Sequence, residues 1–142
     1  MRLPAREVIG VPECPILHRW TLLKVAGCKL LLHHFLPESR DRDPHDHPCS
    51  FVTLVLRGGY VDISSAGRDR LRAGSVRRRR AEHRHVTIAG PRGAWTLVVM
   101  GPKRRPWGFW REGRWWPWRR YEQWFGHGFR CEDVDWSARE VR

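Results

Sequence analysis

Two histidines separated by a single residue, His45 and His47, are the feature of the sequence with the clearest chemical meaning. In an extended segment, side chains two residues apart point in the same direction, so both imidazoles would face one space. Neutral imidazoles are common ligands of divalent transition metals. Two exposed loop histidines are the alternative interpretation, because an isolated His-x-His arises by chance in a chain with eight histidines.

A second segment that carries histidines lies further along the chain, from Gly74 to His85. It begins with a glycine, continues through residues that suit a strand, and delivers both His83 and His85. These two histidines have the same parity, so they would share one face of a strand. A third imidazole is therefore available to accompany the first pair.

The elements that must position these residues are predicted to be short strands. Apolar and β-branched runs alternate with Gly and Pro at short, regular intervals, which is typical of an all-β sandwich or barrel. Only the tail, around residues 119–125, offers a weak helix candidate. We expect two strands within residues 15–36, a loop over 37–48, strands over 51–56 and 60–63 joined by a turn or bend at Gly58 and Gly59, a loop over 64–75, a strand block over 75–88, a turn over 90–93 and a last strand over 95–100.

The composition limits the class of protein. A chain of 142 residues is long enough for one hydrophobic core. It has no apolar run that could cross a bilayer and no segment typical of a secretory signal, so we expect a soluble, cytoplasmic protein with no membrane partner. The four cysteines form no CxxC pair, which argues against a zinc ribbon, and we expect them to be reduced.

Taken together, the motifs resemble the cupin superfamily, whose first motif is His-x-His, a strand and a glycine, and whose second runs from a glycine to a final histidine. The chain is similar in particular to short bacterial and phage cupin-like proteins over about residues 30–110. The resemblance rests on the segments Leu32–Leu36, Arg42–Pro48, Leu56–Tyr60, Ala81–His85, Trp95–Leu97, Gly101–Pro102 and Trp107–Trp110.

The resemblance implies one cupin-like domain over residues 1–142. Its core, from about 15 to 110, would be a small, jelly-roll-like β-barrel, and an aromatic-rich extension over 111–142 would pack on the barrel. Carried over to this sequence, the resemblance makes His45, His47 and His85 the metal ligands. His83 is the alternative third ligand.

One departure from the family pattern concerns the charge of the site. Many cupins place a glutamate ligand four or five residues after the second histidine, where this chain has Phe51 and Val52. We therefore expect three neutral histidines, with water or substrate completing the coordination and the positive charge of the metal uncompensated.

Cupins with three histidine ligands resemble the thiol dioxygenases, which implies Fe(II) and a metal-dependent dioxygenase acting on a small anionic substrate. Zinc, nickel and manganese are the alternative metals. A zinc or nickel site would imply a hydrolase or an isomerase instead.

Three more residues are candidates for the pocket. His33 would line it from a neighbouring strand or belong to the barrel wall. Tyr60 would donate a hydrogen bond to a ligand or be an aromatic wall residue. Arg57 would face the pocket and bind a carboxylate unless a bulge reverses its direction. Asp46, between the first two histidines, should point away from the metal and either orient an imidazole or lie solvated in the loop.

The chain is strongly basic, with a net charge of +12, and it contains nine tryptophans. Only Lys24, Lys29 and Lys103 are lysines, and this preference for arginine is typical of a GC-rich genome. The basic, aromatic tail after Lys103 could bind single-stranded nucleic acid, which would make the protein a non-catalytic binding module. Alternatively, its Trp and Phe residues cover one end of the barrel beneath stacked arginines. The run Arg77–Arg80 either lines a polar pocket or forms a solvated edge.

Overall fold

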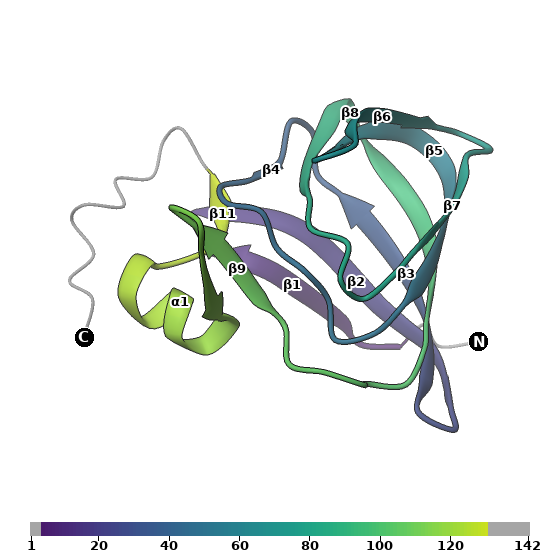
Figure 1. Cartoon of the computed structure of the whole chain (residues 1–142). Coiled ribbons are helices and arrows are strands. Elements are labelled where there is room, and N and C mark those ends of the chain that lie inside the picture. Colours follow the sequence, from purple (N-terminus) through teal and green to yellow (C-terminus); the bar gives the residue numbers. More distant parts are fainter. Residues whose placement is uncertain (1–3, 131–142) are drawn as a thin grey trace.

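The structure is a computed structural model that describes residues 4–130. It is built almost entirely of antiparallel strands (Figure 1). The described elements are β1 (Arg6–Val11), β2 (Cys14–Val25), β3 (Cys28–Phe35), β4 (Arg40–Asp41), β5 (Phe51–Ser64), β6 (Gly67–Arg72), β7 (Val76–Arg79), β8 (Val86–Met100), β9 (Gly108–Arg111), β10 (Arg114–Pro117), α1 (Trp118–Phe125) and β11 (Phe129–Arg130).

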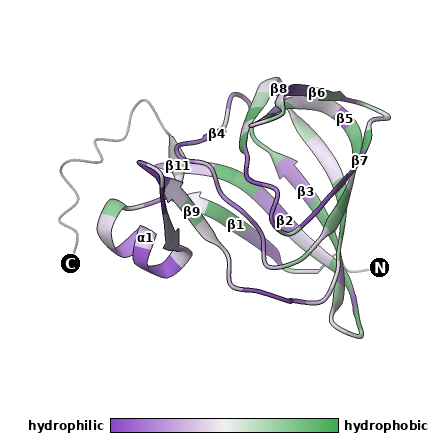
Figure 2. Ribbon diagram, in the orientation of Figure 1, coloured by the Kyte–Doolittle hydropathy of each residue, from purple (hydrophilic) through white to green (hydrophobic). Residues whose placement is uncertain are grey.

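The main sheet runs in the order β1-β2-β3-β8, and β5 pairs with β8 and then with both β6 and β7. This sheet curls so that one face encloses an interior (Figure 1). The core cluster consists of Val55, Tyr60, Leu71 and Ala94, with Phe35 packed against it. Hydrophobic residues concentrate in the barrel strands, whereas α1 is largely hydrophilic (Figure 2). The predicted small all-β barrel of the jelly-roll type is confirmed.

The two strands predicted within residues 15–36 are β2 and β3. The Gly58–Gly59 segment, however, does not end a strand, because β5 continues through it with register shifts on both sides. Gly58 has φ +71°, and a Cβ atom there would lie 2.1 Å from the Gly93 carbonyl oxygen. The two glycines therefore bend one long strand, which pairs with β7 before the bend and with β6 after it.

Three other boundaries differ from the prediction for related reasons. Strand β8 also continues through its glycines, from Val86 to Met100. Strand β6 lies in the predicted loop over 64–75, where alternating charges conceal a strand whose one buried side chain is Leu71. The predicted strand block over 75–88 is divided into β7 and the start of β8.

The C-terminal hairpin and helix pack at one end of the barrel, close to β4 (Figure 1). Helix α1 confirms the weak helix candidate at 119–125. Aromatic rings join it to the hairpin, since Phe109 stacks on Tyr121 at 4.1 Å and Trp107 stacks on Trp118 at 5.8 Å between centroids. Residues 131–142 of the predicted extension lie outside the described residues.

Two further expectations concern membrane-spanning segments and the cysteines. Among the described residues, no helix is long and apolar enough to span a bilayer. Cys28 and Cys49 are free, but Cys14 takes part in a disulfide bond, so the expectation that every cysteine is reduced is wrong.

Candidate metal centre

The backbone brings the two histidine segments together. The N–H of His45 donates to the carbonyl of His85 at 3.0 Å, and the N–H of His85 donates to the carbonyl of His45 at 3.1 Å. The N–H of His47 donates to the Ala81 carbonyl at 2.9 Å. On its other side, His45 forms an antiparallel bridge with Phe109 of β9. The His-x-His segment is therefore an extended strip held between the start of β8 and the C-terminal hairpin.

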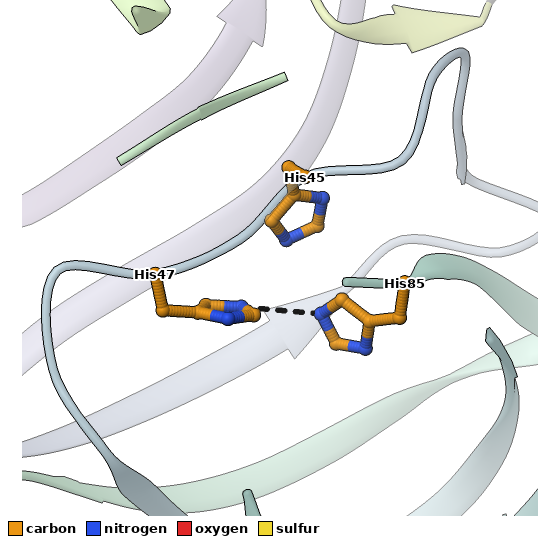
Figure 3. Close-up of side chains that lie close together, drawn as sticks. All are labelled: His45, His47 and His85. Atoms are coloured by element: carbon orange, nitrogen blue, oxygen red, sulfur yellow. Dashed lines mark hydrogen bonds between the residues drawn. The ribbon is translucent and has the colours of Figure 1, made fainter. Parts of the chain in front are cut away.

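The three imidazoles face one another around a common space (Figure 3). Their ring centroids lie 5.0 Å apart for His45 and His47, 4.7 Å for His45 and His85, and 4.8 Å for His47 and His85. One ligand nitrogen from each ring lies within 4.8 Å of the other two, and Nε2 of His47 is 3.1 Å from Nε2 of His85. The structure thus brings together the three histidines that the sequence singled out.

Each of two rings has a carboxylate behind it. The Nδ1 of His85 lies 2.8 Å from Oδ2 of the buried Asp62, and the Nδ1 of His45 lies 3.5 Å from Oδ2 of the buried Asp41. A carboxylate that accepts a hydrogen bond from one ring nitrogen fixes the tautomer, and the other nitrogen keeps its lone pair for a metal. Asp62 therefore turns the Nε2 lone pair of His85 toward the common space.

Asp62 is well suited to remain ionised. Burial by itself would raise its pKa, but hydrogen bonds from His83 and His85 outweigh burial and hold the pKa of Asp62 well below its usual range. The Arg79 guanidinium lies 3.3 Å from the same carboxylate. A permanent negative charge thus stands directly behind a candidate ligand.

Asp41 behaves differently. Burial raises the pKa of Asp41 to about 6, although its carboxylate accepts hydrogen bonds from the N–H and the hydroxyl of Thr87 at 2.7 and 2.9 Å. It can nevertheless supply a second negative charge near neutral pH. The expectation of an uncompensated metal charge thus overlooked two carboxylates, both placed one imidazole away from the centre.

The ligands themselves favour the neutral form. Burial, followed by the charge of neighbouring histidines, lowers the pKa of His45 and of His47 well below 6.5. The Nδ1 atom of His47 is buried, and no group among the described residues makes a hydrogen bond of good geometry with it. The main chain of His83 raises the pKa of His47, but burial outweighs this effect. A metal requires imidazoles in this unprotonated form.

The donor set fits a divalent transition metal. Two nitrogens bonded to one metal at about 2.1 Å lie about 3.0 Å apart when the bonds meet at a right angle, and about 3.4 Å apart in a tetrahedron. The 3.1 Å between the Nε2 atoms of His47 and His85 falls within this range. At this distance the Nε2 lone pairs of His47 and His85 would repel each other if neither a proton nor a cation lay between them.

Phe51, four residues after His47, packs against one side of the site. Its ring lies 4.5 Å from the ring of His47 and 6.5 Å from that of His85. The wall is apolar here, so the negative charge reaches the centre through Asp62 and Asp41 instead of through a direct carboxylate ligand.

His83, the alternative third ligand, belongs to a neighbouring cluster. Its Nε2 lies 3.1 Å from Oδ1 of Asp62, and His83, His85 and Asp62 form a second group with ligand atoms within 4.8 Å of one another. His83 shares a ring contact with His85 at 4.7 Å. It therefore adjoins the centre from behind Asp62 and is not one of the three inward rings.

The structure does not bring Arg57, Tyr60 and His33 to the cluster. A register shift between Val55 and Arg57 reverses the direction of the arginine, which is exposed on the outer face of the sheet. Tyr60 lies in the core cluster, where burial raises its pKa to about 12. His33 is buried on β3, where it accepts a hydrogen bond from Nε of Arg19 at 3.0 Å. Tyr60 and His33 are thus residues of the barrel wall. Arg57 would face the pocket only if β5 had no register shift between Val55 and Arg57.

His33 predicts a measurable dependence of stability on pH. Burial, with a smaller effect of Arg19, lowers its pKa to about 3, whereas an unfolded histidine titrates near 6.5. Below pH 6.5 His33 binds a proton in the unfolded chain but not in the folded protein. The free energy of unfolding therefore falls with decreasing pH until about pH 3. This residue alone should cost about 1 kcal/mol between pH 6 and pH 5.

Urea unfolding of the metal-free protein at these two pH values checks this expectation. His33→Gln, which keeps an acceptor for Arg19, should reduce the loss of stability by about that amount. An equal loss in both proteins would mean that His33 is protonated in the folded state.

Asp46 has a role that sequence reasoning missed. Instead of lying solvated in the loop or orienting a ring, its carboxylate is buried and receives hydrogen bonds from the Gly108 N–H at 2.8 Å, Nε1 of Trp115 at 3.0 Å and Nε1 of Trp110 at 3.3 Å. Arg105 lies 3.4 Å away. Asp46 therefore fastens the histidine strip to the C-terminal hairpin.

Most of the tryptophans in the tail make internal contacts. Besides the Trp107–Trp118 stack, guanidinium groups lie over Trp110, Trp116 and Trp118 at 4.3 to 5.1 Å from the ring centroids. These contacts agree with the interpretation that the tail covers one end of the barrel. Trp124 is 61% exposed, and no guanidinium group from residues 4–130 lies over its ring. Nucleic-acid binding by the tail stays a prediction.

A polar pocket of about 570 Å³ opens beside the centre. Asp62 and His83 form the wall that faces the histidines, and His45, His47 and His85 themselves do not line it. Two of the four consecutive arginines point to this side, where Arg79 and Arg77 both bind Asp69 at 2.7 Å. The other lining residues are Ser64, Ser65, Ala66, Gly67, Arg68, Glu82, Arg84 and Trp110.

The carboxylates of this pocket already have cationic partners, whereas two arginines do not. Asp62 contacts Arg79, and Glu82 pairs with Arg104 at 3.7 Å. Within residues 4–130, neither Arg68 nor Arg84 makes an ion pair, and Arg84 lies over the Trp110 ring at 4.3 Å. The charge available to a ligand in this pocket is therefore positive.

Known proteins resemble this chain in fold. No family model matches the sequence, and no curated protein matches it. An RmlC-like cupin from Shewanella frigidimarina superimposes with a TM-score of 0.59 at 20% identity, covering 72% of this chain and 86% of its own. KdgF from Halomonas sp. gives 0.57 at 16% identity, with 71% and 89% covered. A cupin-superfamily sugar phosphate isomerase from Silicibacter pomeroyi gives 0.53 at 16% identity, with 66% and 64% covered.

Proposed function

We propose that this chain, which has the cupin fold, is a metal-dependent oxygenase that binds one Fe(II) ion through His45, His47 and His85. The observation that carries the proposal is the convergence of three Nε2-type lone pairs, with Asp62 forcing that of His85 inward at 2.8 Å. Iron would supply an open coordination position for oxygen, beside the pocket proposed below for the substrate. The 3.1 Å between the Nε2 atoms of His47 and His85 suits two nitrogens on one metal ion.

The protein residues prepare this centre. Asp62 holds the His85 ring in one tautomer, and Asp41 stands 3.5 Å behind the His45 ring. Phe51 and the buried Phe109 cover the sides of the cluster. The substrate is a small anion held in the adjacent pocket by Arg68 and Arg84, because these guanidinium groups have no competing carboxylate. One of the similar structures is a sugar phosphate isomerase, and a sugar phosphate also carries a negative group.

Oxygen consumption tests the reaction class. The protein is loaded anaerobically with Fe(II), and oxygen uptake is followed with a panel of small carboxylates and phosphate esters. We expect uptake with at least one compound, none with the zinc-loaded protein, and none with His47→Ala. Turnover of the same compounds by the zinc- or nickel-loaded protein without oxygen would replace the oxygenase by a hydrolase or an isomerase.

The pocket arginines predict a separate effect on substrate binding. Each charge-assisted hydrogen bond is worth about 1.5–3 kcal/mol, which corresponds to about a 10- to 100-fold change in affinity. Replacing Arg84 and Arg68 by Gln should therefore raise KM by at least about tenfold and leave the metal content unchanged. Arg92→Gln, an exposed arginine outside the pocket, is the matched control. An unchanged KM in the double variant would place the substrate elsewhere.

A further inference from the structure

The outer face of the main sheet is apolar where solvent should meet polar residues. Inward residues of β3, β5 and β8, such as Leu31, Thr53 and Thr96, are buried, so residues of the opposite parity point out of the barrel. On an antiparallel sheet with one solvated face, those positions are normally polar. Here they are predominantly Leu, Val and Trp.

Strand register arranges these outward residues in three continuous rows across the sheet. We call them together the outer face. Each row crosses five neighbouring strands, and each member is the cross-strand partner of the next. The central row is Trp20, Leu32, Leu97, Leu54 and Val76; one flanking row is Leu23, Leu30, Val99, Val52 and Arg78; the other is Val8, His18, His34, Trp95 and Arg57.

Several of these side chains remain open to solvent in the single chain. Leu23, Val76 and Val99 are 56%, 55% and 50% exposed, and all three are aliphatic. Isolated exposed apolar residues are common, but a contiguous patch of this kind marks a binding surface.

The outer face has the size and anatomy of a protein interface. Five strands about 4.8 Å apart and three rows about 6.8 Å apart cover roughly 500 Å² in plan. Because side chains project from the sheet, the accessible surface of the outer face is larger than this plan area. It approaches the 800 Å² or so that each partner buries in a standard interface. The central row is wholly apolar, and the two charged members, Arg57 and Arg78, stand at one end of each flanking row, which gives the apolar core a polar edge on that side.

We propose that the outer face packs against the same face of a second copy of this chain, which makes the protein a dimer. A second copy presents an equally flat, apolar sheet, and two such sheets pack face to face at about 10 Å with interdigitated side chains. The histidine centre opens on the inner side of the same strands, so each copy keeps its own site free.

The rim adds a signature that distinguishes this partner from others. The three rows contain arginines but no carboxylate. Two identical rims therefore repel each other, and salt should tighten the dimer by screening that repulsion. An acidic protein or an anionic membrane would be held less tightly in salt.

Sedimentation velocity of the full chain tests the dimer between about 1 and 100 µM. We expect a species of about 34 kDa, twice the 16.8 kDa of one chain, whose dissociation constant falls between 0.05 and 0.5 M NaCl. Val99→Lys buries a charge at the interface and should raise the dissociation constant by at least about 100-fold. Trp124→Lys, the same kind of change on α1, should have no effect.

Retained metal content and an unchanged melting curve at high dilution verify that Val99→Lys is folded, and Val76→Lys on β7 is a second variant of the same face. A monomer at every concentration and salt would overturn the proposal, as would a dimer that both variants leave intact. A monomer that binds phosphatidylglycerol vesicles, and loses this binding in Val99→Lys, would assign the face to a membrane instead.

Discussion

Replacing His85 by alanine is expected to abolish stoichiometric metal binding. His85 is the one residue that touches all parts of the centre: its Nε2 faces His47, its Nδ1 binds Asp62, and its main chain pairs with His45. Its loss leaves two imidazoles, of which only His45 has a carboxylate behind it, that of Asp41 at 3.5 Å. Affinity should fall by far more than the 10- to 100-fold or so that removal of an orienting partner costs. Equilibrium competition with a chromophoric chelator, followed by elemental analysis, measures this change.

The same measurement separates ligands from their orienting partners. Asp62→Asn keeps the shape but loses the charge, so the metal should bind about 10- to 100-fold more weakly and still bind stoichiometrically. His34→Ala, a histidine stacked on Trp95 at 4.1 Å on the outer face, is the matched control and should bind as the wild type does. Loss of metal in both His85→Ala and His83→Ala, together with full metal content in His45→Ala and His47→Ala, would move the site to the second cluster, which Asp62, His83 and His85 form.

The three inward histidines could be predicted from sequence because their signal is local. A His-x-His in an extended segment sets two rings on one side, and a histidine that ends a glycine-led segment supplies the third. The strands 15–36, 51–56 and 95–100 were predictable for the same reason, since β-branched and leucine runs between Gly and Pro indicate strands without reference to the rest of the chain.

The carboxylates behind the rings escaped prediction because a bulge hides the direction of Asp62. Simple alternation from Phe51, Thr53 and Val55 would send odd-numbered residues inward along all of β5. The register shift between Val55 and Arg57 exchanges the two faces, so that Tyr60 and Asp62 point inward. The same shift turns Arg57 outward. A paired glycine within a strand is the one sequence signal of such a bend, and it does not give the size of the shift.

Asp41 and Asp46 were inaccessible for a different reason. Asp41 lies in a two-residue strand, β4, that pairs with the distant Ile88 of β8. The partners of Asp46 come from residues 105–115, far along the chain. Buried polar groups are placed by partners that only the fold brings near, and local patterns of polarity assign them to solvent.

The largest effect on stability is expected from Asp46→Ala. Its carboxylate is 2% exposed and satisfies the N–H of Gly108 and the indole N–H groups of Trp110 and Trp115. Removal leaves the buried Gly108 N–H and the two partly buried indole N–H groups without this acceptor, which should lower the free energy of unfolding by about 3–5 kcal/mol. That is a large fraction of the 5–15 kcal/mol or so that stabilises a typical domain. Urea unfolding of the metal-free protein measures it.

The same variant tests whether the hairpin holds the histidine strip in position. Asp46 stands between two candidate ligands, His45 and His47. If its hydrogen bonds hold these ligands in position, Asp46→Ala should also bind metal more weakly, measured at a temperature where the variant is still folded. Glu82→Ala, at an exposed ion pair with Arg104, should change stability by no more than about 0.5 kcal/mol. If Asp46→Ala lost stability but bound metal with wild-type affinity, the backbone pairing of His45 with His85 and Phe109 alone would position the rings.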